Sequence, residues 1–141
     1  MDYSTFTLKN FIIKRYSTLP ELKFPLTQHL REQYDISDDM LDNVAVTFSM
    51  IDAGTGIYRI ANVPVNLVIN RDRVNYPDEE EYTLTYRFKE TQTSKVGRFF
   101  GEFKLDFLPF DGGNGCGKIT LPTQGHINIL ISDSITKTTV I

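Results

Sequence analysis

The sequence contains no tryptophan, a single cysteine and two histidines among its 141 residues. The lone Cys116 cannot form an internal disulfide. His29 and His126 are far apart in the chain and form no local motif for a metal site or a catalytic triad. Apolar runs are much shorter than the ~18–20 residues of a membrane-spanning helix. These shortages predict a protein without enzyme activity, cofactor, metal or membrane insertion.

Net charge, the N-terminal sequence and length give further expectations about partners, compartment and domain number. The formal net charge is −3, and nucleic-acid binding needs a basic face, so nucleic acid is not expected as a partner. The first residues lack the basic start and apolar core of a signal peptide. With only one cysteine, production in a reducing cytoplasm is the expectation. A length of 141 residues predicts a single domain over 1–141, with 1–16 as an N-terminal arm or an edge strand.

The clearest structural pattern lies in residues 97–107. Four apolar residues fall on one side of an extended chain: Phe99, Phe103, Leu105 and Phe107. Charged residues fall on the other side, with Phe100 as the single exception. This period of two is typical of a strand with one buried and one wet face. Residues 97–107, 118–122 and 126–132 are expected to form three consecutive antiparallel strands joined by turns.

Alternation also predicts strands at 22–26, 44–51, 57–60, 63–69 and 82–88. Pro25 cannot donate to a ladder, so its strand should lie at a sheet edge. Residues 5–16 are apolar and aromatic, which fits either a bulged strand or an arm lying on a neighbour. Asp52–Gly56 and Asp111–Gly117 have the composition of chain reversals, and Ser37–Leu41 could form one capped helical turn.

The fold prediction is therefore all-β. An immunoglobulin-like antiparallel β-sandwich of about eight or nine strands fits the spacing of strands and turns best, and a jelly roll or small barrel is the alternative. Six residues on the apolar faces should be buried: Phe48, Leu84, Phe103, Leu105, Ile127 and Ile129.

Two motifs suggest chemistry and fail on inspection. Gly112–Lys118 matches a phosphate-binding loop as far as the lysine, but Ile119 stands where a hydroxyl is needed and a strand follows instead of a helix. Four aspartates offer oxygen ligands of the kind that calcium takes: Asp35, Asp38, Asp39 and Asp42. Their spacing is not that of an EF-hand, so a solvated acidic loop is expected.

Several segments resemble the N-terminal domain of phage baseplate upper proteins. They are KRYSTLPELKFPL at 14–26, VTFSM at 46–50, VGRFFGEF at 96–103, TLP at 120–122 and HINILI at 126–131. The resemblance spans about residues 14–132. It implies an immunoglobulin-like domain in a virion that anchors receptor-binding or fibre proteins, without catalytic residues. Family members continue into a long distal region, whereas this sequence ends soon after its last predicted strand, which favours a small connector, ring or fibre-anchor subunit.

The resemblance thus implies a structural protein of a tailed bacteriophage, made in the host cytoplasm and located in the virion. Its partners would be other virion structural proteins, and it would form a homo-oligomer or ring. The alternative is a carbohydrate-binding module for host-surface glycans that uses exposed Tyr and Phe rings. Contact residues are expected in the N-terminal segment and in the charged loop 70–81: Phe6, Phe11, Ile13, Arg71, Arg73, Tyr76, Glu79 and Glu80.

Overall fold

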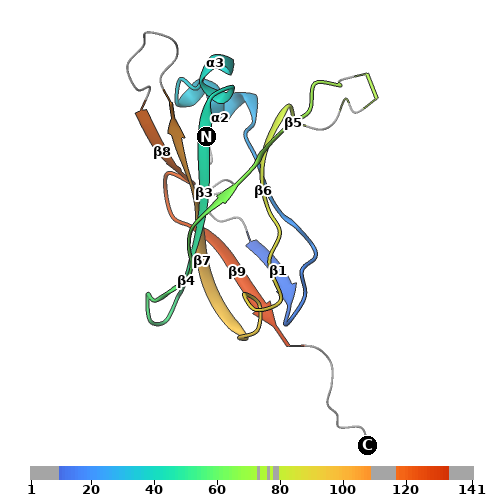
Figure 1. Ribbon diagram of the computed structural model, residues 1–141, viewed down its shortest axis with the longest axis vertical. Helices are drawn as coiled ribbons and strands as arrows, with labels where there is room; N and C mark the ends of the chain where they lie inside the picture. Colours follow the sequence, from blue (N-terminus) through green and yellow to red (C-terminus); the bar gives the residue numbers. More distant parts are fainter. Residues whose placement is uncertain (1–9, 73, 76, 78–79, 109–116, 134–141) are drawn as a thin grey trace, which may run out of the picture.

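The computed structural model describes residues 10–72, 74–75, 77, 80–108 and 117–133. Within them, nine strands form two sheets that pack face to face, and two short helices lie at one end of the sandwich (Figure 1). The prediction of an all-β sandwich with eight or nine strands is confirmed for this part of the chain.

The larger sheet has six strands, in the order β1-β9-β7-β3-β4 with β8 also paired to β7. Their bounds are β1 Asn10–Lys14, β3 Val44–Asp52, β4 Tyr58–Val65, β7 Gly97–Phe107, β8 Gly117–Leu121 and β9 Ile127–Ser132. Strand β7 is central because β3 pairs with its residues 99–107 on one edge. On the other edge, β9 pairs with residues 97–101 and β8 with residues 103–107.

Two expectations about this sheet are wrong. Strands β8 and β9 are both antiparallel to β7 and follow each other along one edge, so residues 122–126 shift the chain sideways and do not reverse it. Strand β1 pairs with β9 in parallel, with Asn10 beside Asn128 and Lys14 beside Ser132. The larger sheet is therefore mixed and not purely antiparallel, because its first and last strands, β1 and β9, lie side by side and run in the same direction.

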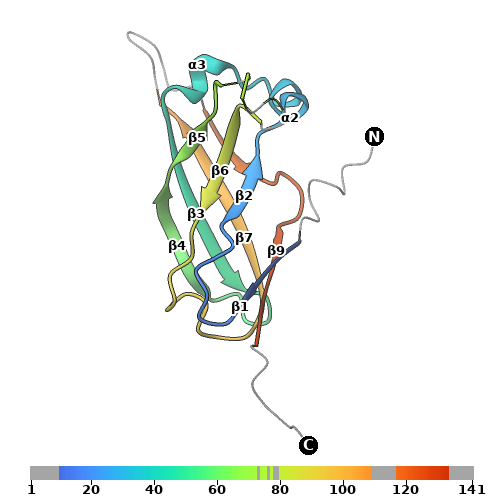
Figure 2. The same cartoon turned by 90° about the vertical axis from the view of Figure 1, so that its right-hand side faces the viewer.

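The smaller sheet has the order β2-β6-β5, with β2 Leu22–Pro25, β5 Leu67–Ile69 and β6 Tyr82–Tyr86. Figure 2 looks onto this sheet. Strand β2 is an edge strand, as its proline predicted. The expected single strand over 63–69 is wrong, because the chain leaves the larger sheet after Val65 and joins the smaller one at Leu67.

The helices are α2 Gln28–Gln33 and α3 Asp38–Leu41. The Ser37 hydroxyl accepts from the Met40 N–H at 3.3 Å and caps α3, as the sequence predicted. Helix α2 was not predicted, since six residues are too few to show a helical period. Leu30 and Leu41 are buried and cover the end of the core. Neither helix, among the residues that are described, is long and apolar enough to cross a membrane.

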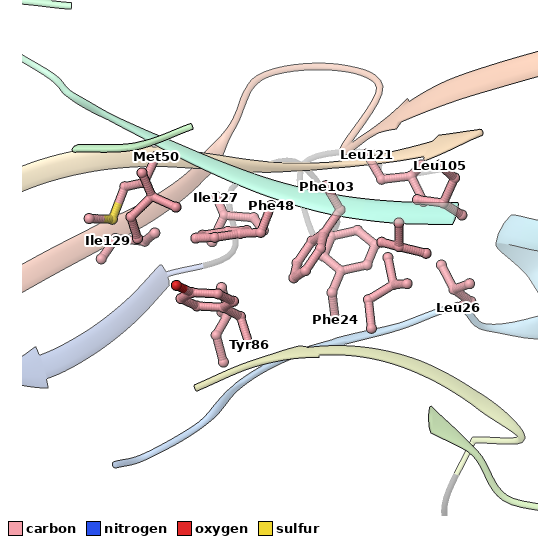
Figure 3. Packing of buried hydrophobic residues seen from close by; sticks show 14 of the residues in the cluster. Phe24, Leu26, Phe48, Met50, Tyr86, Phe103, Leu105, Leu121, Ile127 and Ile129 are labelled. Atoms are coloured by element: carbon pink, nitrogen blue, oxygen red, sulfur yellow. The ribbon is translucent and has the colours of Figure 1, made fainter. Parts of the chain in front are cut away.

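The core lies between the two sheets (Figure 3). Phe48 on β3 stacks on Tyr86 of the opposite sheet at 4.6 Å between ring centroids, and Phe103 on β7 lies 6.2 Å from Phe24. All six residues predicted to be buried are at most 1% exposed: Phe48, Leu84, Phe103, Leu105, Ile127 and Ile129. The core prediction is confirmed.

Candidate interaction face

The outer face of the larger sheet divides into two halves with different side chains. Because strand residues alternate, the outward positions of β7 are 98, 100, 102, 104 and 106. Strand register places Phe100 between Ile51 of β3 and Asn128 of β9, and Tyr58 of β4 beside Ile51. One row further, Arg98 lies beside Leu130, which lies beside Ile12 of β1.

This half of the face carries six apolar or aromatic side chains on five neighbouring strands and the turn before β9. We call them the open patch: Ile12, Ile51, Tyr58, Phe100, His126 and Leu130. Ile12 is 59% exposed, Tyr58 56% and Leu130 39%. Phe100 is half-buried and stacks on His126, with ring centroids 4.8 Å apart and planes at 18°. The patch belongs to the end of the sandwich opposite the helices (Figures 1 and 2).

Two shallow grooves follow the open patch. One has a volume of about 160 Å³ and runs between Tyr58, Phe100 and His126, with Ser49 and Glu102 on its wall. The other has a volume of about 290 Å³ and lies beside the first. Its lining includes Asn10, Ile12, Arg98, Asn128 and Leu130. Both are shallow, so they suit a broad and nearly flat partner surface better than an enclosed small molecule.

The other half of the outer face of the larger sheet is polar, whereas the smaller sheet mixes polar side chains with Val68 and Ile69, which are 47% and 40% exposed. The other half of the larger sheet presents Ala45, Thr47, Lys104, Asp106, Lys118 and Thr120. A groove of about 330 Å³ on the smaller sheet has a mixed lining of Glu21, Lys23, Pro25, Val68, Asn70, Glu80, Thr83 and Thr85. A sheet face in contact with solvent normally carries mostly polar side chains, as the polar half of the larger sheet does. Contiguous apolar surface of the kind in the open patch marks an interaction site.

The residues expected as contacts in the N-terminal segment lie in different environments. Phe6 lies outside the described residues. Ile13 is 1% exposed within the core, so it is not available to a partner and its assignment as a contact residue is wrong. Phe11 is half-buried and stacks on Phe88 at 5.8 Å between centroids. Residues 10–14 therefore add a strand to the chain's own sheet, which was the alternative to an arm on a neighbour.

In the charged loop, Arg73, Tyr76 and Glu79 lie outside the described residues. Arg71 forms ion pairs within the chain, at 3.4 Å to Asp42 and 3.5 Å to Glu81. Glu80 is half-buried and lines the groove of the smaller sheet. The structure thus brings none of these residues to the open patch.

The acidic segment around α3 is held by hydrogen bonds and ion pairs. Asp38 accepts from the Tyr82 hydroxyl at 3.2 Å and lies 3.6 Å from the Arg31 guanidinium. Burial, and then the hydrogen bond to Asp38, raise the pKa of the Tyr82 phenol above its usual value. Among the described residues, no group of three or more His, Cys, Asp or Glu side chains is placed to hold a metal ion.

Lys118, the lysine of the phosphate-loop look-alike, belongs to strand β8 and is exposed. A strand follows it, as predicted; residues 112–116, including Cys116, lie outside the described residues. We expect Lys118→Ala to leave the fold unchanged and the protein to bind no Mg-ATP, because Lys118 lies in a strand and not at the N-terminus of a helix. Calorimetric titration of both proteins checks this. Magnesium-dependent ATP binding that disappears in Lys118→Ala would refute it.

The open patch was not among the predicted contact residues. One signal of it in the sequence is Phe100, the single apolar side chain on the wet face of its strand. No family model matches the chain, and neither a curated protein nor a solved structure matches it.

Proposed function

We propose that this chain is a structural protein of a tailed-bacteriophage virion, a β-sandwich assembly module in a baseplate, tail ring or fibre-anchoring complex. The observation that carries the proposal is the open patch. A sandwich whose core is already complete gains nothing for its own stability from Ile12, Tyr58 and Leu130 in water. Burial of this surface against another protein would contribute about 25 cal/mol for each Å² of apolar area.

Further support comes from the segments that resemble phage baseplate upper proteins. They include residues 97–103 of β7, which carry Phe100, and residues 126–131, which carry Leu130 on β9 and His126 in the turn before it. An immunoglobulin-like classification is part of the same proposal, and two face-to-face sheets with a chain that crosses between them at Asn66 fit it. The partners are other virion structural proteins or further copies of the chain, the location is the virion, and neither nucleic acid nor membrane is a partner.

The proposal is tested by quantifying the chain in particles purified from the cells that produce them. Mass spectrometry of the banded particles should find the chain in a fixed ratio to the other virion proteins. Salt washing should not remove it, because an apolar contact is little weakened by ions. If the chain were found only in the particle-free supernatant, a structural role in the virion would be refuted.

A carbohydrate-binding module remains the second candidate, and one observation favours it. The groove between Tyr58, Phe100 and His126 combines the exposed Tyr58 and His126 rings with the Glu102 carboxylate, groups that can stack on and hydrogen-bond a sugar ring. Under this alternative, a glycan array should give saturable binding that Tyr58→Ala abolishes. If the protein bound no glycan in an array that includes host-surface polysaccharides, the carbohydrate-binding alternative would be excluded and only the assembly role would remain.

A further inference from the structure

The charges around the centre of the open patch form a self-complementary pattern. Arg98 and Glu102 are two residues before and two residues after Phe100 on β7, and all three point outward. Successive outward residues are about 6.6 Å apart along a strand. Arg98 is exposed and Glu102 is half-buried, and neither has an ion-pair partner among the described residues. An apolar centre thus carries one positive and one negative charge at equal distances along one strand.

This arrangement has a definite consequence when two copies meet face to face. Consider a twofold axis in the interface between the larger sheets of two copies, perpendicular to both β7 strands. This axis makes the two β7 strands antiparallel. Phe100 then faces its own copy, and Arg98 of each chain faces Glu102 of the other. Two opposite-charge pairs therefore flank the aromatic centre. If the strands ran parallel instead, each charge would face its own copy and repel it.

Resting on the proposed function, we propose that the occupant of the open patch is a second copy of this chain in that antiparallel arrangement. Twofold interfaces use the same surface on both subunits, so a surface that complements itself is what they require. The rest of the patch agrees with the same axis. Leu130 and His126 are equally far from Asn128, so Leu130 of one copy faces the His126 ring of the other.

The size of the patch sets how strong this association is. Five strands about 4.8 Å apart, and about seven residues along each, give a footprint of roughly 500 Å² per copy. That is the small end of specific interfaces. The dimer should therefore be reversible and concentration-dependent, with charge pairs that decide orientation more than affinity.

Charge reversal combined with mixing tests the inference. Sedimentation equilibrium of the wild type should show a shift from one chain to two as its concentration rises to about 0.2 mM, the range in which weak dimers form. Arg98→Glu and Glu102→Arg should each weaken self-association at least about tenfold, since like charges then face each other twice. A mixture of the two variants should form a heterodimer, because every facing pair is again of opposite sign.

Asp106→Arg is the matched control, since it makes the same kind of change on the same strand and face, but in the polar half. It should associate like the wild type. Restoration on mixing cannot come from two misfolded proteins, which keeps the result independent of any loss of stability.

A wild type that remains one chain at every concentration would overturn the inference. So would single reversals that associate as tightly as the wild type, or variants that do not restore association on mixing. None of these results bears on the virion role itself, because incorporation into particles is measured separately and does not depend on which protein covers the patch.

Discussion

Replacing Phe103 by alanine should lower the free energy of unfolding by about 3–5 kcal/mol, the cost of a large-to-small change in a closed core. Phe103 is completely buried at the centre of the sandwich. Its ring lies 5.0 Å from Phe48 on the neighbouring strand and 6.2 Å from Phe24 in the opposite sheet. The truncation would leave a cavity between both sheets, and these rigid rings cannot close it.

Lys104→Ala is the matched control, because the next residue of the same strand points to solvent. Its stability should change by no more than about 0.5 kcal/mol. Urea unfolding followed by circular dichroism measures both variants. Equal midpoints for Phe103→Ala and Lys104→Ala would show that the buried face of β7 is wrongly assigned.

Replacing Gly101 by valine should cost about 1–3 kcal/mol through overpacking. Gly101 is buried where β7 passes under the core, and a Cβ there would lie 2.8 Å from Ile129 Cδ1 and 3.0 Å from Phe48 Cζ. The Ile129 methyl can move, but the Phe48 ring is stacked on Tyr86 at 4.6 Å. The absence of a side chain at this position therefore makes room for the central aromatic ring.

The cost should grow with the size of the new side chain, so Gly101→Ala should be less damaging than Gly101→Val. Lys104→Val controls for the valine itself on the wet face of the same strand. Thermal unfolding of the three variants gives the order. A Gly101→Val protein as stable as Lys104→Val would mean that the close approach of Phe48 does not exist.

The strands and the core could be predicted because they depend on local alternation. Residues 97–107 show this well, since each inward residue is apolar or glycine and the structure buries the inward ones at 99, 101, 103, 105 and 107. The crossing at Asn66 could not be predicted, because the period of two continues unbroken through 63–69 while the chain changes sheets. Parallel pairing of β1 with β9 joins segments more than a hundred residues apart, and no local pattern encodes it.

The open patch was only partly visible in the sequence for the same reason. Its strands contain consecutive apolar residues, as in Phe11-Ile12-Ile13, Phe99-Phe100 and Ile129-Leu130-Ile131. Such runs place an apolar side chain on each face of a strand. They do not show that three of these strands lie side by side, which is what joins single exposed residues into one surface. That step needs the strand order of the folded sheet.

Incorporation of two arginine variants into particles tests the role of the open patch most directly. Tyr58→Arg places a charge in the patch, whereas Ala45→Arg places it on an exposed position in the polar half of the same face. The measurement is the number of copies of each variant per purified particle, by mass spectrometry, after both have been shown to unfold at the wild-type temperature. We expect Tyr58→Arg to reduce the copies at least about tenfold, the effect of losing roughly 1.4 kcal/mol of contact energy, and Ala45→Arg to leave them unchanged. Equal incorporation of the two variants would contradict the assignment of the open patch as the assembly surface.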